Sequence, residues 1–323
     1  MTKFKVLIAD SRHSHYKIET EILAEIGADL IIKDCKNEYE LADNVKDIDG
    51  ILVNLVPVTA DVIKNCNRCR VISRYGVGYD NVDVIEAKKK NIYVCNVPDY
   101  CTEDVSDHAI ALLLSCIRQT SYRTAAIKKG DWDLSKKNKI YRIKDKVIGL
   151  IGYGRIAREF HRKLIGFGLK KILVFDPYIS KITAKNNNIV LTDIQTLLKE
   201  SDYISIHCQL NKKTKHLISK KELDLMKDSS IIINTSRGPI IDEEALYTAL
   251  NNGNIAGAGL DVFEKEPIKI DNPLLKLNNV VLTDHTAWYS EESIIELKTK
   301  AAQNVKDTLQ GKIPRYLIKE FKV

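Results

Sequence analysis

A glycine-rich turn between an apolar run and a helix-like stretch limits what this chain can fold into more than any other feature. The hexapeptide 152–157, Gly-Tyr-Gly-Arg-Ile-Ala, fits the pattern G-x-G-x-x-G/A. It follows the apolar run 147–151 and opens a helical stretch at 155–167. Gly152 permits a tight turn, and Gly154 allows the backbone to approach a pyrophosphate at the helix N-terminus. We therefore predict a strand–turn–helix unit that binds a dinucleotide.

The next predicted strand, 172–175, ends at Asp176, where a carboxylate can discriminate between dinucleotides. It would accept hydrogen bonds from the adenosine ribose hydroxyls and repel a 2′-phosphate, which favours NAD over NADP. Because Pro177 follows, a helix cap or a turn is the alternative interpretation of Asp176. The expected cofactor contacts around the turn are Gly152, Gly154, Arg155, Ile156, Asp176 and Cys208.

Short apolar runs rich in β-branched residues alternate with polar-faced helical stretches along the chain. The first hundred residues hold such runs at 5–9, 29–33, 50–55, 70–74 and 92–97. A second series follows at 147–151, 172–175, 203–207, 231–235, 256–262 and 280–283. This rhythm is typical of buried parallel strands, and the second series completes the strand set of a dinucleotide-binding domain. We predict an α/β fold with two doubly wound parallel-sheet domains.

The order of these runs predicts that one domain is inserted into the other. A chain of 323 residues exceeds one typical core, so two domains are expected. The helical stretch 291–309 comes after the second series of strands is complete, and we expect it to return to the first domain. Residues 1–98 and 290–323 would then form a discontinuous, flavodoxin-like substrate domain. Residues 99–289 would form a Rossmann NAD domain inserted into it.

Composition and charge argue against several classes of protein. With 44% apolar and 29% charged residues, the chain has an ordinary globular composition. The net charge of +7 comes mainly from scattered lysines, without the interleaved aromatic residues of a nucleic-acid patch. No apolar run of about 18 residues and no N-terminal leader is apparent, which argues against a membrane span or secretion. We expect no nucleic-acid or membrane partner, and the surplus positive charge favours small anionic substrates.

The seven cysteines predict a cytoplasmic protein. An odd number of cysteines in a chain of this size fits reduced thiols better than a disulfide framework. Cys66 and Cys69 have CxxC spacing, but no second pair and no suitably spaced histidine accompany them. We therefore expect no metal site, and we disfavour a redox role for this pair.

Arg237, Glu266 and His285 each lie just past the end of a predicted strand of the second sheet. The carboxyl ends of parallel strands meet at one edge, so we expect these three side chains to form one site. Arginine can hold a carboxylate bidentately, imidazole exchanges a proton near neutral pH, and a nearby glutamate can tune that imidazole. Taken singly, they are better interpreted as a surface ion pair, a solvated loop residue and a structural histidine. Together they indicate a catalytic triad suited to 2-hydroxy acids.

The chain resembles the D-isomer-specific 2-hydroxyacid dehydrogenases over essentially its full length. The segments that carry the resemblance are 74–83, 152–157, 234–238, 259–267 and 285–288. The resemblance implies that Arg237 binds the carboxylate and carbonyl of the substrate. It also implies that His285 is the acid/base and that Glu266 pairs with His285.

The same resemblance implies contacts outside the triad. The backbone amides of Val77 and Gly78 would bind the substrate carboxylate. The nicotinamide side of the cofactor would contact Thr235, Ser236 and Asp261. One departure is Asp284, because the family usually places proline before the histidine. A carboxylate at this position would change the pH optimum or the rigidity of the loop.

Two residues indicate the size of the substrate. Asn54 stands where the similar phosphoglycerate dehydrogenases usually place a phosphate-binding arginine, so a phosphorylated acid would lose a strong charge-assisted contact. Trp288 follows the histidine closely and would wall the pocket, although packing at the domain junction is the alternative. We expect reversible reduction of a small or medium unphosphorylated 2-oxo acid to the D-2-hydroxy acid.

The resemblance also raises other functions and an oligomeric state. Residues 288–291 look most similar to the carboxyl-terminal binding protein branch, so an NAD-sensing, corepressor-like binding protein with little turnover is the alternative. Formate dehydrogenase is disfavoured, because glutamine is implied there in place of Glu266. We also expect a homodimer, built by the helix 103–118 and by the arm that follows it to about Lys144 and includes Trp132. An internal packing element is the alternative for that arm.

Overall fold

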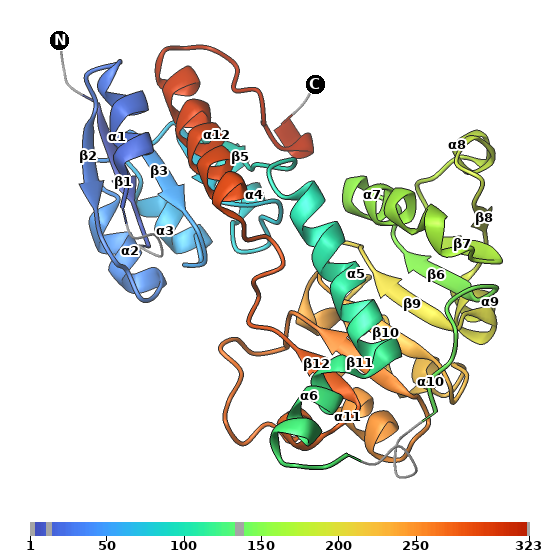
Figure 1. Cartoon of the computed structure of the whole chain (residues 1–323). Helices are drawn as coiled ribbons and strands as arrows, with labels where there is room; N and C mark the ends of the chain where they lie inside the picture. Colours follow the sequence, from blue (N-terminus) through green and yellow to red (C-terminus); the bar gives the residue numbers. More distant parts are fainter. Residues whose placement is uncertain (1–3, 11–14, 133–138, 322–323) are drawn as a thin grey trace. The chain divides into compact units, whose positions relative to one another are not determined.

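The computed structural model describes residues 4–10, 15–132 and 139–321, and the chain divides into two compact units (Figure 1). The first unit consists of Met1–Cys101 and Ser290–Val323, and the second of Thr102–Tyr289. The first unit thus takes both ends of the chain. It also includes residues 99–101, which the sequence analysis gave to the other domain, because Asp99 binds Lys300 and Tyr316 at 3.0 Å each.

Within the described residues, the sheet of the first unit is five-stranded and parallel, in the order β2-β1-β3-β4-β5. Its strands are β1 (Lys5–Ile8), β2 (Asp29–Ile32), β3 (Gly50–Val53), β4 (Val71–Arg74) and β5 (Tyr93–Cys95). The parallel sheet predicted from the first series of apolar runs is confirmed. Neighbouring residues of a strand point to opposite faces, so Ile72 enters one buried layer while Ser73 faces the other.

Helices cover both faces of this sheet. They are α1 (Lys17–Ala24), α2 (Glu38–Asn44), α3 (Ala60–Asn65), α4 (Val84–Lys89) and α12 (Glu291–Leu309), with a 3-10 turn η4 (Lys319–Phe321). Apolar residues of α2, α3 and α4 join the layer of Ile72. On the other face α12 packs against α1, β3 and β4, and Ala301 O accepts a hydrogen bond from Ser73 Oγ at 3.0 Å. The late helix therefore belongs to the first unit.

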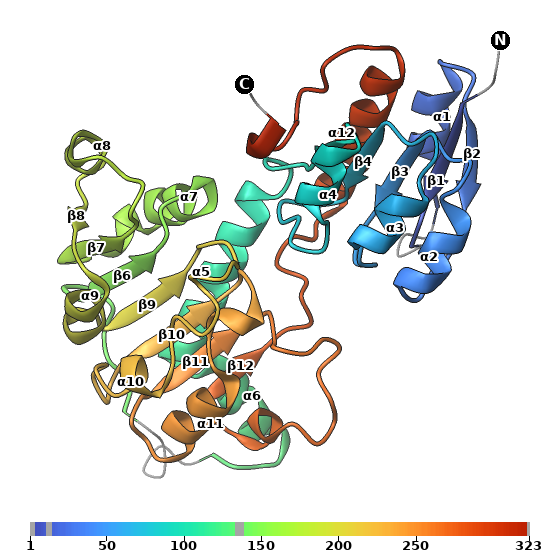
Figure 2. The ribbon, with the colours of Figure 1, turned by 180° about the vertical axis from the view of Figure 1, so that it is seen from behind.

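In the part of the second unit that the structure describes, seven parallel strands form one sheet in the order β12-β11-β10-β9-β6-β7-β8 (Figure 2). They are β6 (Val147–Ile151), β7 (Lys171–Phe175), β8 (Val190–Leu191), β9 (Tyr203–Ile206), β10 (Ile231–Asn234), β11 (Gly257–Leu260) and β12 (Val280–Leu282). The chain winds outward from β6 to β8, then returns to β9 and winds the other way. This is the doubly wound fold that we predicted, with its switch point between β6 and β9. The edge strand β8 was missed, since two residues carry too little periodicity.

The helices of the second unit also form two layers. They are α5 (Thr102–Arg118), α6 (Thr120–Lys128), α7 (Arg155–Leu164), α8 (Lys181–Asn186), α9 (Ile194–Glu200), α10 (Lys220–Leu223) and α11 (Glu243–Asn251), with 3-10 turns η1 (Ile165–Phe167), η2 (Gly238–Ile240) and η3 (Pro273–Lys276). Helix α5 contacts α7 and lies along β10, β11 and β12. Its Leu112 and Leu113 pack with Ile233 of β10, whereas α9, α10 and α11 pack on the face of Ile232. No helix among the described residues combines the length and the apolar character needed to cross a bilayer.

Candidate active site

The register of three neighbouring strands brings the predicted triad to one edge of the second sheet. Asn234 of β10 pairs with Leu260 of β11, and Leu260 pairs with Leu282 of β12. The strands therefore end level with one another. The segments that follow them carry Arg237, Glu266 and His285, as the sequence analysis expected for the carboxyl edge of a parallel sheet.

His285 and Glu266 are joined directly. His285 Nδ1 lies 2.6 Å from Glu266 Oε2, and Glu266 Oε1 accepts a hydrogen bond from Phe263 N at 3.0 Å. Burial raises the pKa of Glu266, but the hydrogen bond and charge of His285, the Phe263 N–H and the charge of Arg237 outweigh burial and lower it. The ionised carboxylate accepts, so Nδ1 carries a proton, and Nε2 is the ring nitrogen that can exchange a proton with a substrate.

The backbone at His285 is held in an uncommon conformation. Its φ is 58°, in the left-handed region, which costs a residue other than glycine about 1–3 kcal/mol. His285 N donates to Asp261 O at 2.8 Å, and Thr286 Oγ1 donates to Asp284 Oδ1 at 3.0 Å. Asp284, the departure from the family pattern, therefore holds the turn on which the histidine lies.

Arg237 lies on a turn that Asn234 closes. Asn234 Nδ2 donates to Arg237 O at 2.9 Å, and Asn234 Oδ1 accepts from Ser236 N at 3.0 Å. A Cβ on Gly238 would lie 1.9 Å from the carbonyl carbon of Phe263, so only glycine lets this turn pack against the segment that carries Glu266. Neither Asn234 nor Gly238 was predicted from the sequence as a site residue. Their position inside the matching segment 234–238 is the signal that could have found them.

The nucleotide turn has the features that a dinucleotide needs. Gly152 has a φ of 88°, and a Cβ there would lie 2.8 Å from Cys208 N, so the predicted contact residues Gly152 and Cys208 lie together. A Cβ on Gly154 would meet no described atom within 4 Å, which leaves room for a phosphate at the start of α7. The two predicted contacts Arg155 and Ile156 form the first turn of α7.

Asp176 holds the turn on both sides. Its Oδ2 accepts from Tyr153 N and its Oδ1 from Tyr178 N, each at 2.8 Å. Asp176 therefore holds a turn, which was the alternative interpretation of this residue from the sequence. Each carboxylate oxygen still has a second lone-pair direction for a ribose hydroxyl, so the two interpretations are compatible.

Thr235 and Ser236, which are expected near the nicotinamide, differ in whether their hydroxyl groups have hydrogen-bond partners. The Thr235 hydroxyl is buried and has no hydrogen-bond partner among the described residues, which is unusual for a buried polar atom. Ser236 Oγ donates to Ile206 O at 2.9 Å. The unsatisfied hydroxyl of Thr235 is what a site for an amide-bearing ligand would present. The residues of this site therefore fit NAD, the cofactor predicted from the sequence.

Val77 and Gly78 belong to the first unit and follow β4 at the carboxyl edge of that unit's sheet. Asn96 Nδ2 donates to Val77 O at 2.7 Å, and Val97 N donates to Gly76 O at 2.9 Å. These contacts fix the loop to the end of β5. Trp288, the predicted pocket wall, packs edge-on against Tyr289 with ring centroids 5.7 Å apart.

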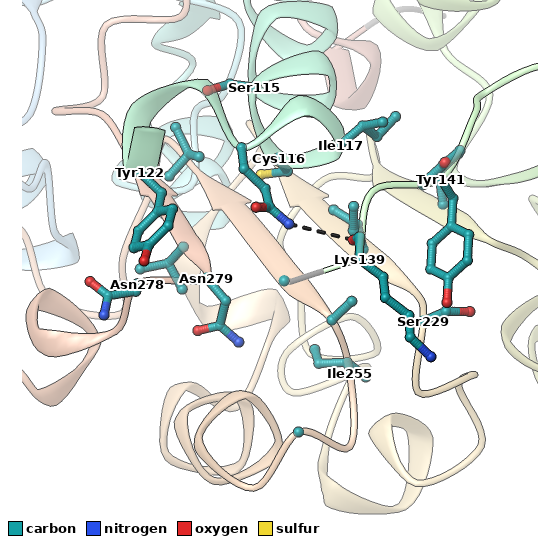
Figure 3. A pocket seen from close by; sticks show the side chains of 18 of the residues that line it. Ser115, Cys116, Ile117, Tyr122, Lys139, Tyr141, Ser229, Ile255, Asn278 and Asn279 are labelled. Carbon is teal, nitrogen blue, oxygen red and sulfur yellow. Dashed lines mark hydrogen bonds between the residues drawn. The ribbon is translucent and has the colours of Figure 1, made fainter. Parts of the chain in front are cut away.

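A cavity of about 380 Å³ lies at the opposite, amino edge of the second sheet (Figure 3). Tyr203, Ile231 and Gly257, at the starts of β9, β10 and β11, line its floor. Cys116 of α5 and Tyr122 of α6 line its walls, together with Lys139, Tyr141 and Asn279. The candidate active site and this cavity are therefore at different edges of the same sheet.

Comparison with known proteins gives a consistent result. Residues 110–287 match the family model described as the D-isomer specific 2-hydroxyacid dehydrogenase, NAD binding domain. The chain is 39% identical to D-3-phosphoglycerate dehydrogenase of Methanocaldococcus jannaschii over 97% of its own length, but it spans only 59% of that relative. It is 38% identical to glyoxylate reductase of Korarchaeum cryptofilum, with 87% of this chain and 85% of that protein covered.

Solved structures are similar over nearly the whole chain. A glyoxylate reductase from Paecilomyes thermophila superposes with a TM-score of 0.90 at 27% identity, with 100% of both chains covered. The D-lactate dehydrogenase of Aquifex aeolicus, complexed with NAD and lactic acid, has a TM-score of 0.86 at 29% identity, with 95% of this chain and 96% of that chain covered.

Proposed function

We propose that this chain, which belongs to the family of D-isomer-specific 2-hydroxyacid dehydrogenases, reversibly reduces a 2-oxo acid to the D-2-hydroxy acid with NAD as its cofactor. The observation that carries the proposal is the 2.6 Å contact of His285 with Glu266, whose pKa is also lowered by the charge of Arg237. An acid/base, its carboxylate partner and a guanidinium thus share one edge of an NAD-binding sheet.

In this mechanism each member of the triad has a separate role. Arg237 binds the substrate carboxylate and polarises the carbonyl, which stabilises the alkoxide as it develops. His285 Nε2 donates the proton to the carbonyl oxygen during reduction and takes it back during oxidation. Glu266 holds the Nδ1 proton and stabilises the imidazolium. Bound NADH supplies the hydride, and the chain orients the reactants.

We assign the backbone N–H groups of Val77 and Gly78 to the substrate carboxylate, because Asn96 and Val97 hold the carbonyls of Val77 and Gly76 and so fix the shape of this loop. Asp176 favours NADH over NADPH, since it would repel a 2′-phosphate. Thr235, Ser236 and Asp261 complete the contacts expected on the nicotinamide side.

We expect the substrate to be a small or medium unphosphorylated 2-oxo acid, such as glyoxylate, hydroxypyruvate or pyruvate. Asn54, in place of an arginine, supports this choice, and several similar proteins are named glyoxylate or hydroxypyruvate reductases. If Trp288 walls the pocket, Trp288→Ala shifts kcat/KM toward 2-oxo acids with bulkier groups at C3. An unchanged ranking of substrates would assign Trp288 to packing alone.

The deciding experiment is an NADH-oxidation screen over 2-oxo acids of graded size, with 3-phosphohydroxypyruvate included. Turnover of at least one unphosphorylated acid, abolished in His285→Ala, is the expected result. A higher kcat/KM for the phosphorylated acid than for every other acid would overturn the substrate assignment. Tight NADH binding without turnover of any acid would favour the corepressor-like alternative instead.

A homodimer is the assembly that we assign to this chain. Trp132 on the arm is 88% exposed and Ile127 of α6 is 48% exposed, both close in sequence to residues that line the amino-edge cavity. A contiguous exposed apolar patch commonly marks an interface, and we assign these two side chains to such a patch. Sedimentation equilibrium of the wild type should give a dimer, and Trp132→Ser should weaken it. A monomeric wild type would instead make the arm an internal packing element.

We also assign the protein to the cytoplasm. All seven cysteines lie in the part of the chain that the structure describes, and each is a free thiol. Free thiols, most of them buried, suit a reducing compartment. Fractionation of the source cells would test this assignment.

A further inference from the structure

We propose that His108 is a positioning residue for His285, and that it acts through Thr283 and Asp261. His108 lies on α5, far from the triad in the sequence, and nothing in the sequence pattern marks it. The inference rests on the proposed function, because it concerns the geometry of the acid/base in that reaction. Its parts are hydrogen bonds within the second unit.

The chain of contacts begins at the imidazole of His108. Its Nε2 lies 2.9 Å from Thr283 Oγ1, just after β12, and 3.5 Å from Asp261 Oδ1. The Thr283 hydroxyl donates its proton to Asp261 Oδ1 at 2.6 Å. Because that proton is used, the Thr283 oxygen can only accept from His108, and Nε2 must carry the hydrogen. The direction of the whole chain is thus fixed, from imidazole to hydroxyl to carboxylate.

Asp261 connects the hydrogen bonds of His108 and Thr283 to the turn that carries His285. Its side chain is 1% exposed, and a buried carboxylate is stable only when donors surround it. Besides Thr283, the donors are Thr286 N to Oδ1 and Ala287 N to Oδ2, each at 3.0 Å. The Asp261 carbonyl accepts from His285 N. One residue therefore binds the backbone on both sides of the left-handed His285.

The hydrogen bonds to Asp261 explain how a strained histidine keeps one orientation. Left-handed backbone at a residue other than glycine persists only where the surroundings over-determine it. Helix α5 packs along β10, β11 and β12, so it presents His108 from a rigid element. Removal of the His108 donor would leave the Thr283 hydroxyl free to turn from Asp261, and the Thr286–Ala287 backbone would lose its fixed acceptor. The His285 ring would then depart from its contact with Glu266.

The test compares four variants with the wild type: His108→Leu, His108→Gln, Thr283→Val and the double variant His108→Leu/Thr283→Val. Because a misplacement of 1 Å in a catalytic group can cost about 10²-fold in rate, His108→Leu should lower kcat by roughly 10-fold or more. The KM for NADH should change by much less than kcat, because the contacts at the nucleotide turn are untouched and only Asp261, on the nicotinamide side, belongs to the network. Gln restores an N–H donor and should recover most of kcat. The double variant should be no slower than the slower single variant, since contacting residues of one network are not additive.

A control on the same helix separates positioning from packing. Cys116→Ala truncates a half-buried side chain of α5 near β11 and should lower stability without a matching loss of kcat. The inference fails if His108→Leu keeps kcat within about 2-fold of the wild type, or if the losses in the double variant multiply. It also fails if Cys116→Ala loses as much kcat as His108→Leu.

A second readout is independent of turnover. The imidazole NMR resonance of His285, assigned by its disappearance in His285→Ala, should move in His108→Leu and return toward its wild-type position in His108→Gln. Cys116→Ala should leave it in place. If the wild type reduces no 2-oxo acid, the proposed function fails, and this resonance alone decides the role of His108. An unmoved resonance in His108→Leu would overturn the inference.

Discussion

The carboxyl edges of the two sheets use ionisable side chains in opposite ways. In the first unit, the buried carboxylate of Asp10 accepts from the backbone N–H groups of residues 54–56, and Arg74 Nε donates to Asn54 O at 3.2 Å. Charged groups there fix loops, and it is the backbone of residues 77–78 that we assign to the substrate. In the second unit, His285 and Glu266 pair with each other and are each 31% exposed. Here the side chains themselves are the exposed groups, and the backbone of His285 is strained.

This difference separates recognition from chemistry. Backbone N–H groups survive every substitution except proline, so a loop that binds through them depends on its shape rather than on its side chains. An acid/base has to be a side chain, and it depends on a partner that holds its proton. Substitutions should therefore fail differently: those of the His285–Glu266 pair at the second edge in kcat, and those of the loop 76–78 at the first edge in KM.

The largest effect is expected at the second edge. His285→Ala should lower kcat by roughly 10²–10⁴-fold, the usual contribution of general acid–base catalysis, with little change in NADH affinity. The matched change at the first edge is Val77→Ala, which leaves the backbone N–H in place and should change kcat and KM by only a few-fold. Steady-state kinetics and NADH fluorescence titration measure both. A His285→Ala variant that turns over as fast as Val77→Ala would remove the distinction between the edges.

The shape of the first edge is tested by Gly76→Ala. Gly76 has a φ of 142°, and a Cβ there would lie 1.5 Å from Arg74 Nη1, so alanine must displace the loop or the guanidinium. We expect the KM for the 2-oxo acid to rise by about 10-fold, with a smaller change in NADH affinity. Gly166→Ala is the control, because a Cβ there meets no described atom within 4 Å. Equal kinetics for the two alanine variants would contradict a shape-dependent loop.

A smaller effect is expected for the choice of cofactor, which does not involve the His285–Glu266 pair. Asp176→Ser should narrow the kcat/KM preference for NADH over NADPH by several-fold, because the charge that repels a 2′-phosphate is gone. Asp193→Ser is the control, since Asp193 caps α9 in the same unit and serine can also cap a helix. Equal use of both dinucleotides by the wild type would mean that Asp176 only holds the turn.

The smallest effect concerns how the stability that the Glu266–His285 pair contributes depends on pH. Burial raises the pKa of Glu266, but the hydrogen bond and charge of His285, the Phe263 N–H and the charge of Arg237 together lower it in the folded protein. Its contribution to stability is therefore present above the ordinary value of 4.5 and disappears as pH falls through the folded value. Glu266→Gln should cost less than about 2 kcal/mol near neutral pH and nothing in strong acid. Urea unfolding of Glu266→Gln and the wild type across this range measures it, and a loss of stability that persists in strong acid would contradict the assignment.

The sequence predicted the sheets well because strand periodicity and a glycine turn are local signals. Every apolar run of the second series became a strand, whereas β8, with two residues, had no pattern to detect. The triad was predictable because each residue follows a strand, and parallel strands align their ends. His108 was not, because its contact with Thr283 depends on how α5 packs across the sheet. Asp284 was noticed as a departure, but its hydrogen bond with Thr286 required the turn itself.

The route of the chain through the first unit affects the order in which its parts can fold. Helix α12 buries Leu297, Ala301 and Val305 in a core whose strands, β1 to β5, are synthesised long before it. The ribosome must therefore complete the whole second unit before the first can close its apolar face.

Domains generally fold as units during synthesis, so the contiguous Thr102–Tyr289 unit can reach its final structure while the earlier one waits. In the nascent chain, the NAD-binding part would be the first to resist proteolysis. The part that begins the polypeptide would be the last to mature, and a chaperone would find its exposed sheet face available until residues 291–309 emerge.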